Sequence, residues 1–378
     1  MKVIVAGDFY DGGRVSENLS SDLFQPFGEI SPIISEAQFK IVNFEFPIVD
    51  SNASPIAKDG PHLSGTEQSI KIIKDAGFNV CTLANNHILD YGPDCCIDTM
   101  RKLQNHGIST VGVGSNVEEA SNILYLKDSD KTLAVINCCE HEFSIAEFDS
   151  PGANPLSPIQ QFYQIQEASI HADYVLVIIH GGHEHYQLPS PRMQETYRFY
   201  IDAGADVVVN HHQHCFSGYE VYKGKPIFYG LGNFLFDSPN YRNTHWNTGF
   251  FVELDFSSKD SISYNLHPYS QCNEYPNVRL MNEPQKKVFY KKIRELNTII
   301  GDVHLLTQEY TDWVESTSDH YLMIFQPYMH YILRAMYIRK LLPTFMNKRK
   351  KYHILGLLKC QSHFDRLVHM VSKLKTDK

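Results

Sequence analysis

The sequence predicts a layered α/β fold followed by a C-terminal helical appendage. Up to about residue 270, short apolar runs alternate with amphipathic segments, and polar residues gather where the apolar runs end. The remainder of the chain has a helical pattern. Strands that alternate with helices are typical of layered α/β domains. The 378 residues, 43% of them hydrophobic, are enough for one large core with an additional module.

The expected elements follow in order along the chain. Strands are expected over 2–8, 39–45, 79–87, 131–139, 173–182, 206–212 and 226–236, and amphipathic helices over 65–77, 95–107 and 193–204. Ser64 and Glu67 have the spacing of a capping box for the first of these helices. Gly77, Gly107 and Gly204 stand where the helices should end. The local signals therefore agree with the alternating pattern.

We place the domain boundary between residues 283 and 284. The segment 284–378 is rich in Tyr and Met, and its Lys and Arg are concentrated from Arg334 onward. One interpretation is a helical appendage that packs on the core and exposes a solvated charged face. The other is a basic amphipathic surface that binds a partner or the inner face of a membrane.

Charge and composition argue against several classes of protein. A net charge of -9 and a pI near 6.1 are unlike those of a general nucleic-acid binder, so no nucleic-acid partner is expected. The longest apolar run, 174–179, is far shorter than the roughly 18 residues of a membrane-spanning helix. Met1 leads directly into an expected strand without room for a signal peptide, so we expect a cytoplasmic protein.

The 8 cysteines do not form a disulfide or zinc pattern. Two adjacent pairs occur, at 95–96 and 138–139, and no C-x-x-C is found. Reduced thiols are therefore expected, and a cysteine-ligated zinc site is not.

Polar side chains gather at the carboxyl ends of the expected strands, which is where open α/β sheets bind ligands. A dinuclear metal centre needs carboxylate, amide and imidazole ligands from several elements, with one carboxylate able to bridge two ions. The residues of this type at the strand ends are Asp8, Glu45, Asn86, His180, His212 and His214. The sequence therefore predicts a metal site at this edge. Taken singly, Asp8 could instead cap a turn and Glu45 could be a loop carboxylate.

Six sequence blocks give the chain a resemblance to a known family. They are "VAGDF", "VNFEFPI", "LANNHILDYG", "HGGHEHYQLPSPRMQ", "DAGADVVVNHHQH" and "GKPIFYGLGNFLFD". In this order, from residue 3 to about 240, the chain resembles the CapA family of poly-γ-glutamate capsule biosynthesis proteins, which is similar in fold to calcineurin-like metallophosphoesterases. The resemblance implies an α/β/β/α sandwich over 1–283 and a metal-dependent hydrolase.

The resemblance also implies roles for single residues. Asp8 is the implied ligand on the first strand, Glu45 the bridging carboxylate and Asn86 a ligand of the second metal, and imidazole ligands come from His180, His212 and His214. His87 takes the place of the general acid, because a histidine can hold and release a proton near neutral pH. Asp90 would orient or tune His87. The implied cofactors are one or two divalent ions of Mn, Fe or Zn.

Further polar residues are candidates for contact with the substrate, for which we expect an anionic polymer or a phosphorylated small molecule. They are Asn43, Asn85, Glu184, Arg192 and Asn233. Asn85 is also a good turn former, and Glu184 and Arg192 could form a surface ion pair. Asn233 belongs to a tight turn expected beneath the site, and His211 is expected to be structural rather than a ligand.

The chain departs from the implied pattern at three positions. Tyr10 stands where dinuclear phosphoesterases usually have a histidine, Gly181 replaces a tryptophan, and Gln213 replaces a proline. Three functions therefore stay open. The first is a metal-dependent hydrolase or transferase acting on a phosphate ester or on a bond of a charged polymer. The others are a non-catalytic subunit of a capsule or exopolymer assembly with a vestigial metal site, and a ligand-binding module.

Overall fold

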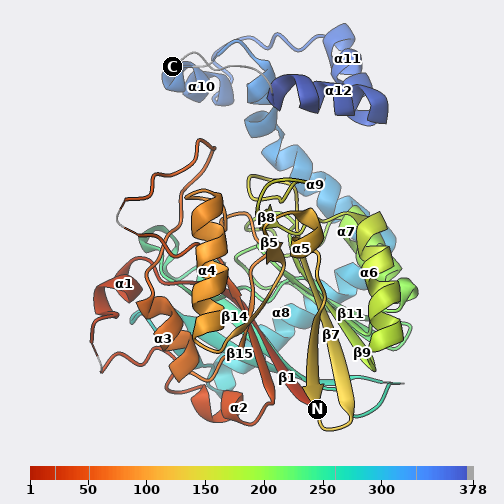
Figure 1. Cartoon of the computed structure of the whole chain (residues 1–378). Coiled ribbons are helices and arrows are strands. Elements are labelled where there is room, and N and C mark those ends of the chain that lie inside the picture. The colour runs from red at the N-terminus through yellow and green to blue at the C-terminus, as the bar shows by residue number, and fades with distance from the viewer. Residues whose placement is uncertain (22, 51, 260, 329, 373–378) are drawn as a thin grey trace. The chain divides into compact units, whose positions relative to one another are not determined.

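The computed structural model describes residues 1–21, 23–50, 52–259, 261–328 and 330–372 (Figure 1). The chain divides into two compact units, Met1–Thr307 and Gln308–Lys378.

Two β-sheets form the centre of the first unit. The larger sheet has the strand order β16 (Val278–Leu280), β15 (Ser263–Gln271), β14 (Thr248–Asp255), β1 (Lys2–Tyr10), β2 (Phe39–Phe44), β3 (Val80–Thr82), β4 (Ser109–Val111), with β13 (Asn233–Phe236) also paired to β1. The second sheet has the order β11 (Tyr219–Tyr222), β12 (Lys225–Phe228), β10 (Val207–His211), β9 (Tyr174–His180), β7 (Lys131–Cys139), β6 (Leu124–Asp128). A small sheet pairs β5 (Val113–Gly114) with β8 (Gly152–Ala153).

The sheets pack against each other, and helices cover their outer faces. Phe228 of β12 and Phe250 of β14 lie 6.4 Å apart between ring centroids, which joins the two sheets. The larger sheet carries α1 (Arg14–Asn18), α2 (Ser31–Ser35), α3 (Gln68–Asp75) and α4 (Pro93–Asn105), and the second carries α6 (Pro158–His171) and α7 (Pro191–Ala203) (Figure 1). The short helix α5 (Val117–Ala120) lies by the small sheet. The predicted α/β/β/α sandwich is confirmed.

The central strands of each sheet run parallel, which brings their carboxyl ends together. In the larger sheet β1 pairs in parallel with β2 and β13, and β2 pairs in parallel with β3. In the second sheet β9 pairs in parallel with β7 and β10. Parallel strands present the same end at the same edge, so the polar residues that follow them face one region.

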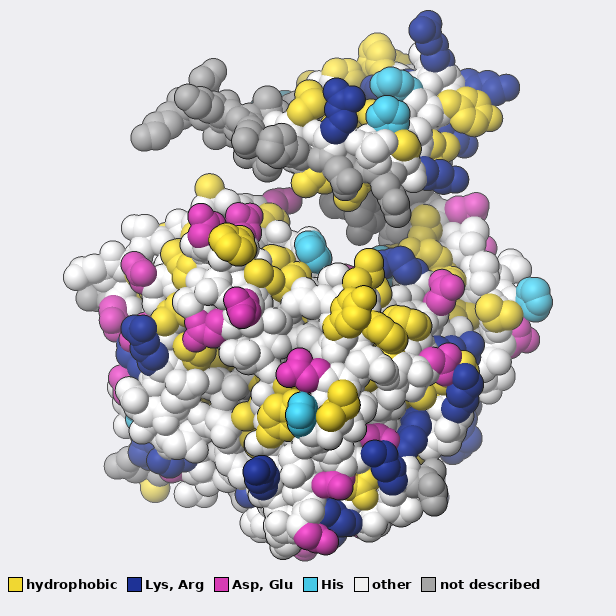
Figure 2. Space-filling model, turned by 45° about the vertical axis from the view of Figure 1, so that its right-hand side comes forward, with side chains coloured by type: hydrophobic (Ala, Val, Ile, Leu, Met, Phe, Trp, Pro, Cys, Tyr) yellow, Lys and Arg dark blue, Asp and Glu magenta, His cyan; other side chains and the backbone are white. Residues whose placement is uncertain are grey.

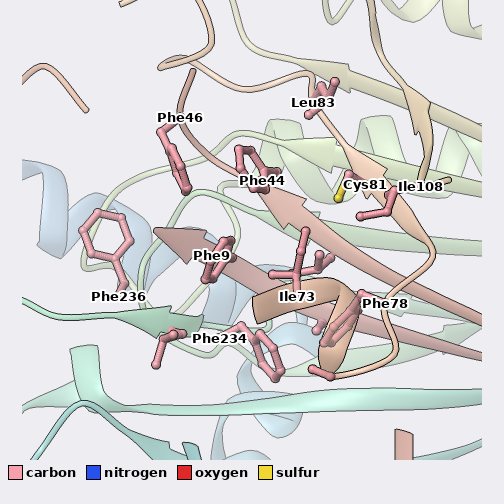
Figure 3. Close-up of a cluster of buried hydrophobic side chains, with 14 of the residues drawn as sticks. Phe9, Phe44, Phe46, Ile73, Phe78, Cys81, Leu83, Ile108, Phe234 and Phe236 are labelled. Atoms are coloured by element: carbon pink, nitrogen blue, oxygen red, sulfur yellow. The ribbon is translucent and has the colours of Figure 1, made fainter. Parts of the chain in front are cut away.

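An aromatic cluster holds the ends of β1 and β2 in place (Figure 3). The ring of Phe9 lies 5.6 Å from those of both Phe44 and Phe46, and Phe27 stacks on Phe234 at 5.0 Å. All five side chains are buried to at least 98%. Close packing of this kind resists displacement, so the neighbouring Asp8 and Glu45 are rigidly placed.

A glycine contact brings β13 next to β1. A Cβ atom on Gly7 would lie 1.8 Å from the carbonyl oxygen of Gly232, so only glycine fits there. Gly232 itself has a φ of +79°. This is the tight turn expected beneath the site, and it pairs Asn233 with Asp8 across the strands.

Most helix ends follow the sequence signals. Gly204 ends α7 in a left-handed conformation with φ +119°, and Gly77 and Gly107 follow α3 and α4 with φ +97° and +77°. The predicted capping box is wrong: α3 begins at Gln68, Glu67 is its N-cap, and no side chain caps it. Glu67 lies in the turn before the helix and so cannot occupy the third helical position that a capping box needs.

The first unit extends beyond the predicted boundary at 283/284. The helix α8 (Glu283–Gly301) buries Phe289, Ile293, Leu296 and Ile300. Phe289 lies 5.0 Å from the ring of Phe216, in the first unit. The compact unit therefore runs to Thr307, because the amphipathic helix that opens the predicted extension is part of the core.

The second unit is helical where it is described. It contains the main part of α9 (Val303–Leu322), then η3 (Met323–Phe325), α10 (Tyr331–Ile338), α11 (Lys348–Lys359) and α12 (Gln361–Ser372). Gln326 joins two of its segments, since its Oε1 accepts a hydrogen bond of 2.8 Å from the backbone of Phe345. Among the described residues of the whole chain, no helix has the length and apolarity needed to cross a membrane.

Candidate metal centre

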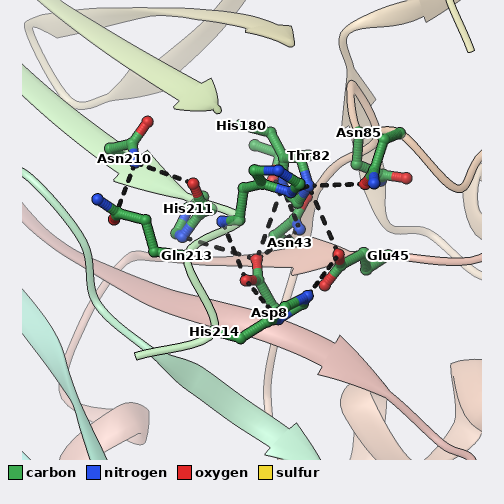
Figure 4. Close-up of polar contacts among 12 residues, drawn as sticks. Asp8, Asn43, Glu45, Thr82, Asn85, His180, Asn210, His211, Gln213 and His214 are labelled. Carbon is green, nitrogen blue, oxygen red and sulfur yellow. Dashed lines mark hydrogen bonds and ion pairs between the residues drawn. The ribbon is translucent and has the colours of Figure 1, made fainter. Parts of the chain in front are cut away.

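The six predicted ligands lie close together at the strand ends of the two sheets. Figure 4 shows Asp8, Glu45, His180 and His214 among them. Asp8 lies near the end of β1, Glu45 follows β2, His180 ends β9, and His212 and His214 follow β10. Two groups of His and carboxylate side chains have ligand atoms within 4.8 Å of one another: Glu45 with His180 and His212, and Asp8 with Glu45 and His214. Glu45 belongs to both groups.

The first group surrounds the Nε2 atom of His180. This nitrogen lies 3.0 Å from Asn86 Oδ1, 3.1 Å from His212 Nδ1 and 3.5 Å from Glu45 Oε1. Nitrogen and oxygen atoms at these separations can face a common ion, and imidazole with carboxylate suits Zn, Fe or Mn. Asn86, the implied ligand of the second metal, is therefore brought together with Glu45, His180 and His212.

The second group consists of Asp8, Glu45 and His214. Asp8 Oδ2 lies 3.7 Å from His214 Nδ1, and Glu45 Oε1 lies 3.8 Å from His214 Nε2. Tyr10, the departure from the implied pattern, packs its ring on Phe236 at 4.8 Å and on Phe46 at 5.4 Å. Among the described residues, this position therefore has three candidate ligands of His and carboxylate type, and Tyr10 contributes to the aromatic core.

Glu45 is the strongest sign that the cluster holds cations. Its side chain is fully buried, and neither carboxylate oxygen has a hydrogen-bond partner. Burial raises the pKa of Glu45 well above the usual range, and the nearby charge of Asp8 raises it further. An unpaired carboxylate in a dry site is strongly unfavourable, whereas bound cations would satisfy both oxygens. The residues present therefore fit divalent metal ions.

The buried imidazoles are in the form that metals bind. Burial lowers the pKa of His180 well below its usual range, with His212 lowering it further, and burial lowers the pKa of His214 to about 3 although Asp8 opposes this. Both rings are therefore neutral near pH 7. Metal ligands must be deprotonated, so the site is ready to bind without releasing protons from these rings.

The backbone of the cluster is strained at two of its ligands. His212 has a φ of +93° and His214 a φ of +54°. Residues other than glycine rarely adopt such values. Such a conformation costs about 1–3 kcal/mol and is found mainly at functional sites. The strain turns both imidazoles toward Asp8 and Glu45 within three residues of the strand end.

Two predicted substrate contacts instead hold ligands in place. Asn43 donates a hydrogen bond of 2.7 Å to Asp8 Oδ1 and lies 3.2 Å from His180 Nδ1. Asn233 Oδ1 accepts a 2.8 Å hydrogen bond from His214 Nδ1, which leaves Nε2 to face Glu45. Both asparagines are fully buried and lie behind the ligands. Partners of this kind orient a ligand and fix its tautomer.

Asn85 is also buried and structural. Its side-chain nitrogen donates to the carbonyl oxygens of Phe44 and Leu83, and its oxygen accepts a hydrogen bond of 3.1 Å from the backbone of His87. Both polar atoms of the Asn85 side chain are therefore occupied by contacts with the backbone, and neither faces the cavity. Asn85 shapes the loop that presents Asn86 and His87.

His87 and Asp90 form the expected pair, and a lysine that the sequence did not single out joins them. Asp90 Oδ2 accepts a 2.7 Å hydrogen bond from His87 Nδ1. Lys58 forms an ion pair with Asp90 Oδ1, and its Nζ lies 3.2 Å from His87 Nδ1. The lysine side chain is only 2% exposed. No motif marks Lys58, because a loop from elsewhere in the chain brings it here.

Glu142 is a second residue that the sequence analysis missed. Its Oε2 accepts a 3.0 Å hydrogen bond from Asn86 Nδ2, and its Oε1 lies 3.8 Å from His212 Nε2. It therefore contacts His212 of the first group and the neighbouring Asn86. A signal was present, since Glu142 follows the buried strand β7 as the predicted ligands follow theirs.

A cavity of about 820 Å³ opens over the cluster. Lys58, Asn86, His87, Glu142 and His214 are among the residues that line it, with Tyr241 and Trp246 on an aromatic side. Trp246 and Tyr241 are stacked with ring centroids 4.8 Å apart. Two candidate metal ligands, His87 and a cationic side chain thus face one space.

The remaining predicted residues lie at or beyond the rim. Glu184 is exposed and lines the cavity. Arg192 has a side chain that is 72% exposed and pairs with Glu140 at 3.3 Å, outside the lining of the cavity. Arg192 therefore forms a surface ion pair, although its partner is Glu140 rather than Glu184.

His211 is buried, and its two ring nitrogens have no hydrogen-bond partner.

Comparison with known proteins gives similar relatives. The chain is 33% identical over 246 residues to a capsule biosynthesis protein CapA of Bacillus anthracis, covering 63% of this chain and 60% of that protein. It is 34% identical over 227 residues to a PGA biosynthesis protein CapA of Bacillus subtilis, covering 59% of each. The chain thus spans about 60% of the length of these relatives.

Solved structures give more remote likenesses. A novel phosphatase from Mycoplasma pneumoniae is 15% identical with a TM-score of 0.45, covering 76% of this chain and 96% of that chain. A 5'-nucleotidase from Candida albicans is 12% identical with a TM-score of 0.44, covering 83% of this chain and 57% of that chain.

The family model described as bacterial capsule synthesis protein PGA_cap matches residues 2–238. This range includes every predicted ligand, the His87–Asp90 pair and the turn that places Asn233. The chain belongs to the bacterial capsule synthesis protein PGA_cap family.

Proposed function

We propose that the chain is a metal-dependent hydrolase that cleaves a phosphoester in an anionic substrate. One observation carries the proposal: the unpaired, fully buried carboxylate of Glu45 is shared by two groups of ligands. A bridging carboxylate of this kind is what a dinuclear centre requires. Names of the relatives given above support a role in the synthesis of capsule or poly-γ-glutamate.

Two sets of residues would each bind one metal ion. Asp8, Glu45 and His214 would hold one ion, and Glu45 with Asn86, His180 and His212 would hold the other. Two bound ions of Mn, Fe or Zn would polarise the phosphoester and supply an activated water. Asn43 and Asn233 fix the geometry from behind.

His87 is suited to protonate the leaving group. Its Nδ1 donates to Asp90, so Nε2 is the atom left to give a proton to an oxygen bound in the cavity. A positioned general acid contributes about 10²- to 10⁴-fold to the rate. Lys58 balances the charge of Asp90 and adds a positive charge at the lining, which favours an anionic substrate.

The test uses protein loaded with Mn²⁺, Fe²⁺ or Zn²⁺ and two phosphodiesters that differ in their leaving group. His87→Ala should slow cleavage of an alkyl ester by about 10²- to 10⁴-fold. The loss should be much smaller with a p-nitrophenyl ester, whose leaving group needs no proton. His141→Ala, a change at the same cavity, is the control. No metal-dependent cleavage of either ester would contradict the proposal.

A second candidate function is a non-catalytic subunit of a capsule or exopolymer assembly. It is favoured by the three-ligand position of Asp8, Glu45 and His214, where Tyr10 packs away instead of adding an imidazole. Elemental analysis of protein purified without chelators separates the two. Two equivalents of metal favour the hydrolase, and none favours the assembly role.

A further inference from the structure

The end of the chain separates charge to an unusual degree. Residues 302–319 contain five Asp or Glu and no Lys or Arg, whereas residues 320–364 contain eight Lys or Arg and no Asp or Glu. Helices that are only solvated usually mix both signs, because opposite charges three or four residues apart stabilise them. The eight cations have no acidic partner within their own segment, so an anionic partner from outside would complement them.

Apolar side chains are exposed in the same unit at helical spacing. On α12, Phe364 is 44% exposed, Val368 50% and Val371 57%. Steps of four and three residues place these three side chains on one face of the helix. A stripe of this kind is normally buried against a core, and here it faces outward.

The basic and apolar side chains belong to consecutive, packed helices. The first turn of α11 carries Lys348, Arg349 and Lys351, all exposed, and α11 packs on α12. Tyr331 and Tyr352 are 73% and 62% exposed in α10 and α11. Figure 2 shows Lys and Arg in dark blue interspersed with yellow hydrophobic side chains on the visible face of this unit. Tyrosines with an apolar body and a polar tip are typical of membrane interfaces.

We propose that the second unit docks on the surface of an anionic phospholipid bilayer. The stripe of Phe364, Val368 and Val371 would enter the interface, and the Lys and Arg side chains would lie against lipid phosphates. No described helix is suited to cross a membrane, which agrees with a unit that lies on the surface. A second copy of this face is disfavoured because a symmetric contact would bring like charges together.

Sedimentation with vesicles tests this proposal on the full chain, independently of any hydrolase activity. We expect binding to vesicles of phosphatidylcholine with phosphatidylglycerol, little binding to phosphatidylcholine alone, and release by salt. Replacing Lys348, Arg349, Lys351 and Lys359 by Gln should weaken binding on the order of fivefold for each charge removed. The matched control replaces Lys71, Lys74, Lys287 and Lys291 by Gln. It removes the same number of positive charges, but from the first unit.

The apolar stripe has its own variant. Changing Phe364, Val368 and Val371 to Ser should also reduce binding, while the same change at Ile159, Tyr163 and Ile170, which are 74%, 67% and 78% exposed on α6, should not. Circular dichroism checks that each variant keeps its helices. Equal binding to neutral and anionic vesicles, or unchanged binding in both variants of the second unit, would overturn the proposal. A dimer lost in the Ser variant, with no vesicle binding, would assign the stripe to a second copy and also overturn it.

Discussion

The candidate metal centre and the basic C-terminal helices place their functional side chains in opposite environments. In the centre, Glu45 and His180 are buried and lie 3.5 Å apart, although more than a hundred positions separate them in the sequence. In the second unit, Lys348 and Phe364 are exposed, and their pattern is visible within two consecutive helices. Burial makes each group in the centre depend on its neighbours, whereas exposed charges act nearly independently.

Loss of one ligand should have the largest effect. His212→Ala should abolish the high-affinity metal site, because a buried imidazole of the first group is removed and Glu45 loses a shared cation. Isothermal titration with Mn²⁺ or Zn²⁺ measures the loss, which should exceed the roughly 100-fold caused by removing a supporting contact. Vesicle binding should be unchanged. A parallel loss of vesicle binding would show that the two regions are not separate.

Lys58→Met should destabilise the fold by about 3–5 kcal/mol, because it leaves the buried charge of Asp90 without its ion-pair partner. Denaturant unfolding measures the change. The double variant Lys58→Met, Asp90→Asn should recover much of the loss, because the unpaired charge is then absent. If the two changes in the free energy of unfolding simply add in the double variant, Lys58 and Asp90 do not stabilise each other. Buried charges would then be no more dependent on their neighbours than exposed ones.

Acid should destabilise the metal-free protein through its buried histidines. Burial lowers the pKa of His211 and of His214 to about 3, while an unfolded histidine titrates near about 6.5. Between these values the unfolded chain binds more protons, so the free energy of unfolding falls as pH falls from about 6.5 to about 3. Unfolding of chelator-treated protein across this range should show the fall. His211→Phe should make it shallower, and an unchanged slope would contradict the role of His211.

Asn233→Ala should weaken metal binding by about 10- to 100-fold, since His214 loses the partner that fixes its tautomer. Asn240→Ala, at the exposed rim of the same cavity, is the matched control and should change little. Titration calorimetry compares the two. Equal affinities would mean that the strained backbone alone positions His214.

Arg192→Ala should have the smallest effect. Arg192 belongs to the same unit as the candidate metal centre, but its side chain is exposed. Its pair with Glu140 is exposed, so stability should change by less than about 0.5 kcal/mol. Metal-dependent cleavage should also stay within a few-fold of the wild type. A large loss of cleavage would place Arg192 at the substrate after all.

Local pattern was enough to predict the candidate ligands, because each lies at the end of an apolar strand and parallel strands bring such ends to one edge. All six candidate ligands could be predicted for this reason, and the sequence blocks added the role implied for each of them. The same reasoning, applied after β7, would have found Glu142. The amphipathic helices and their glycine ends could also be read from spacing.

Tertiary packing decided what surrounds the ligands. The sequence did not show that Asn43 and Asn233, predicted as substrate contacts, form hydrogen bonds with the candidate ligands Asp8 and His214. The partner of Lys58 lies 32 positions away in another loop, and no local periodicity relates the two. The antiparallel strands β14 and β15 were not among the expected elements.

The sequence by itself determined the alternating strands and helices, the ligand types and the charge separation near the C-terminus, because these depend on neighbours within a turn or a strand. Only the tertiary structure decided that Asn233 supports His214, that Lys58 joins His87 and Asp90, and that α8 belongs to the first unit. Contacts between distant segments depend on how whole layers pack, and spacing along the chain does not encode that packing.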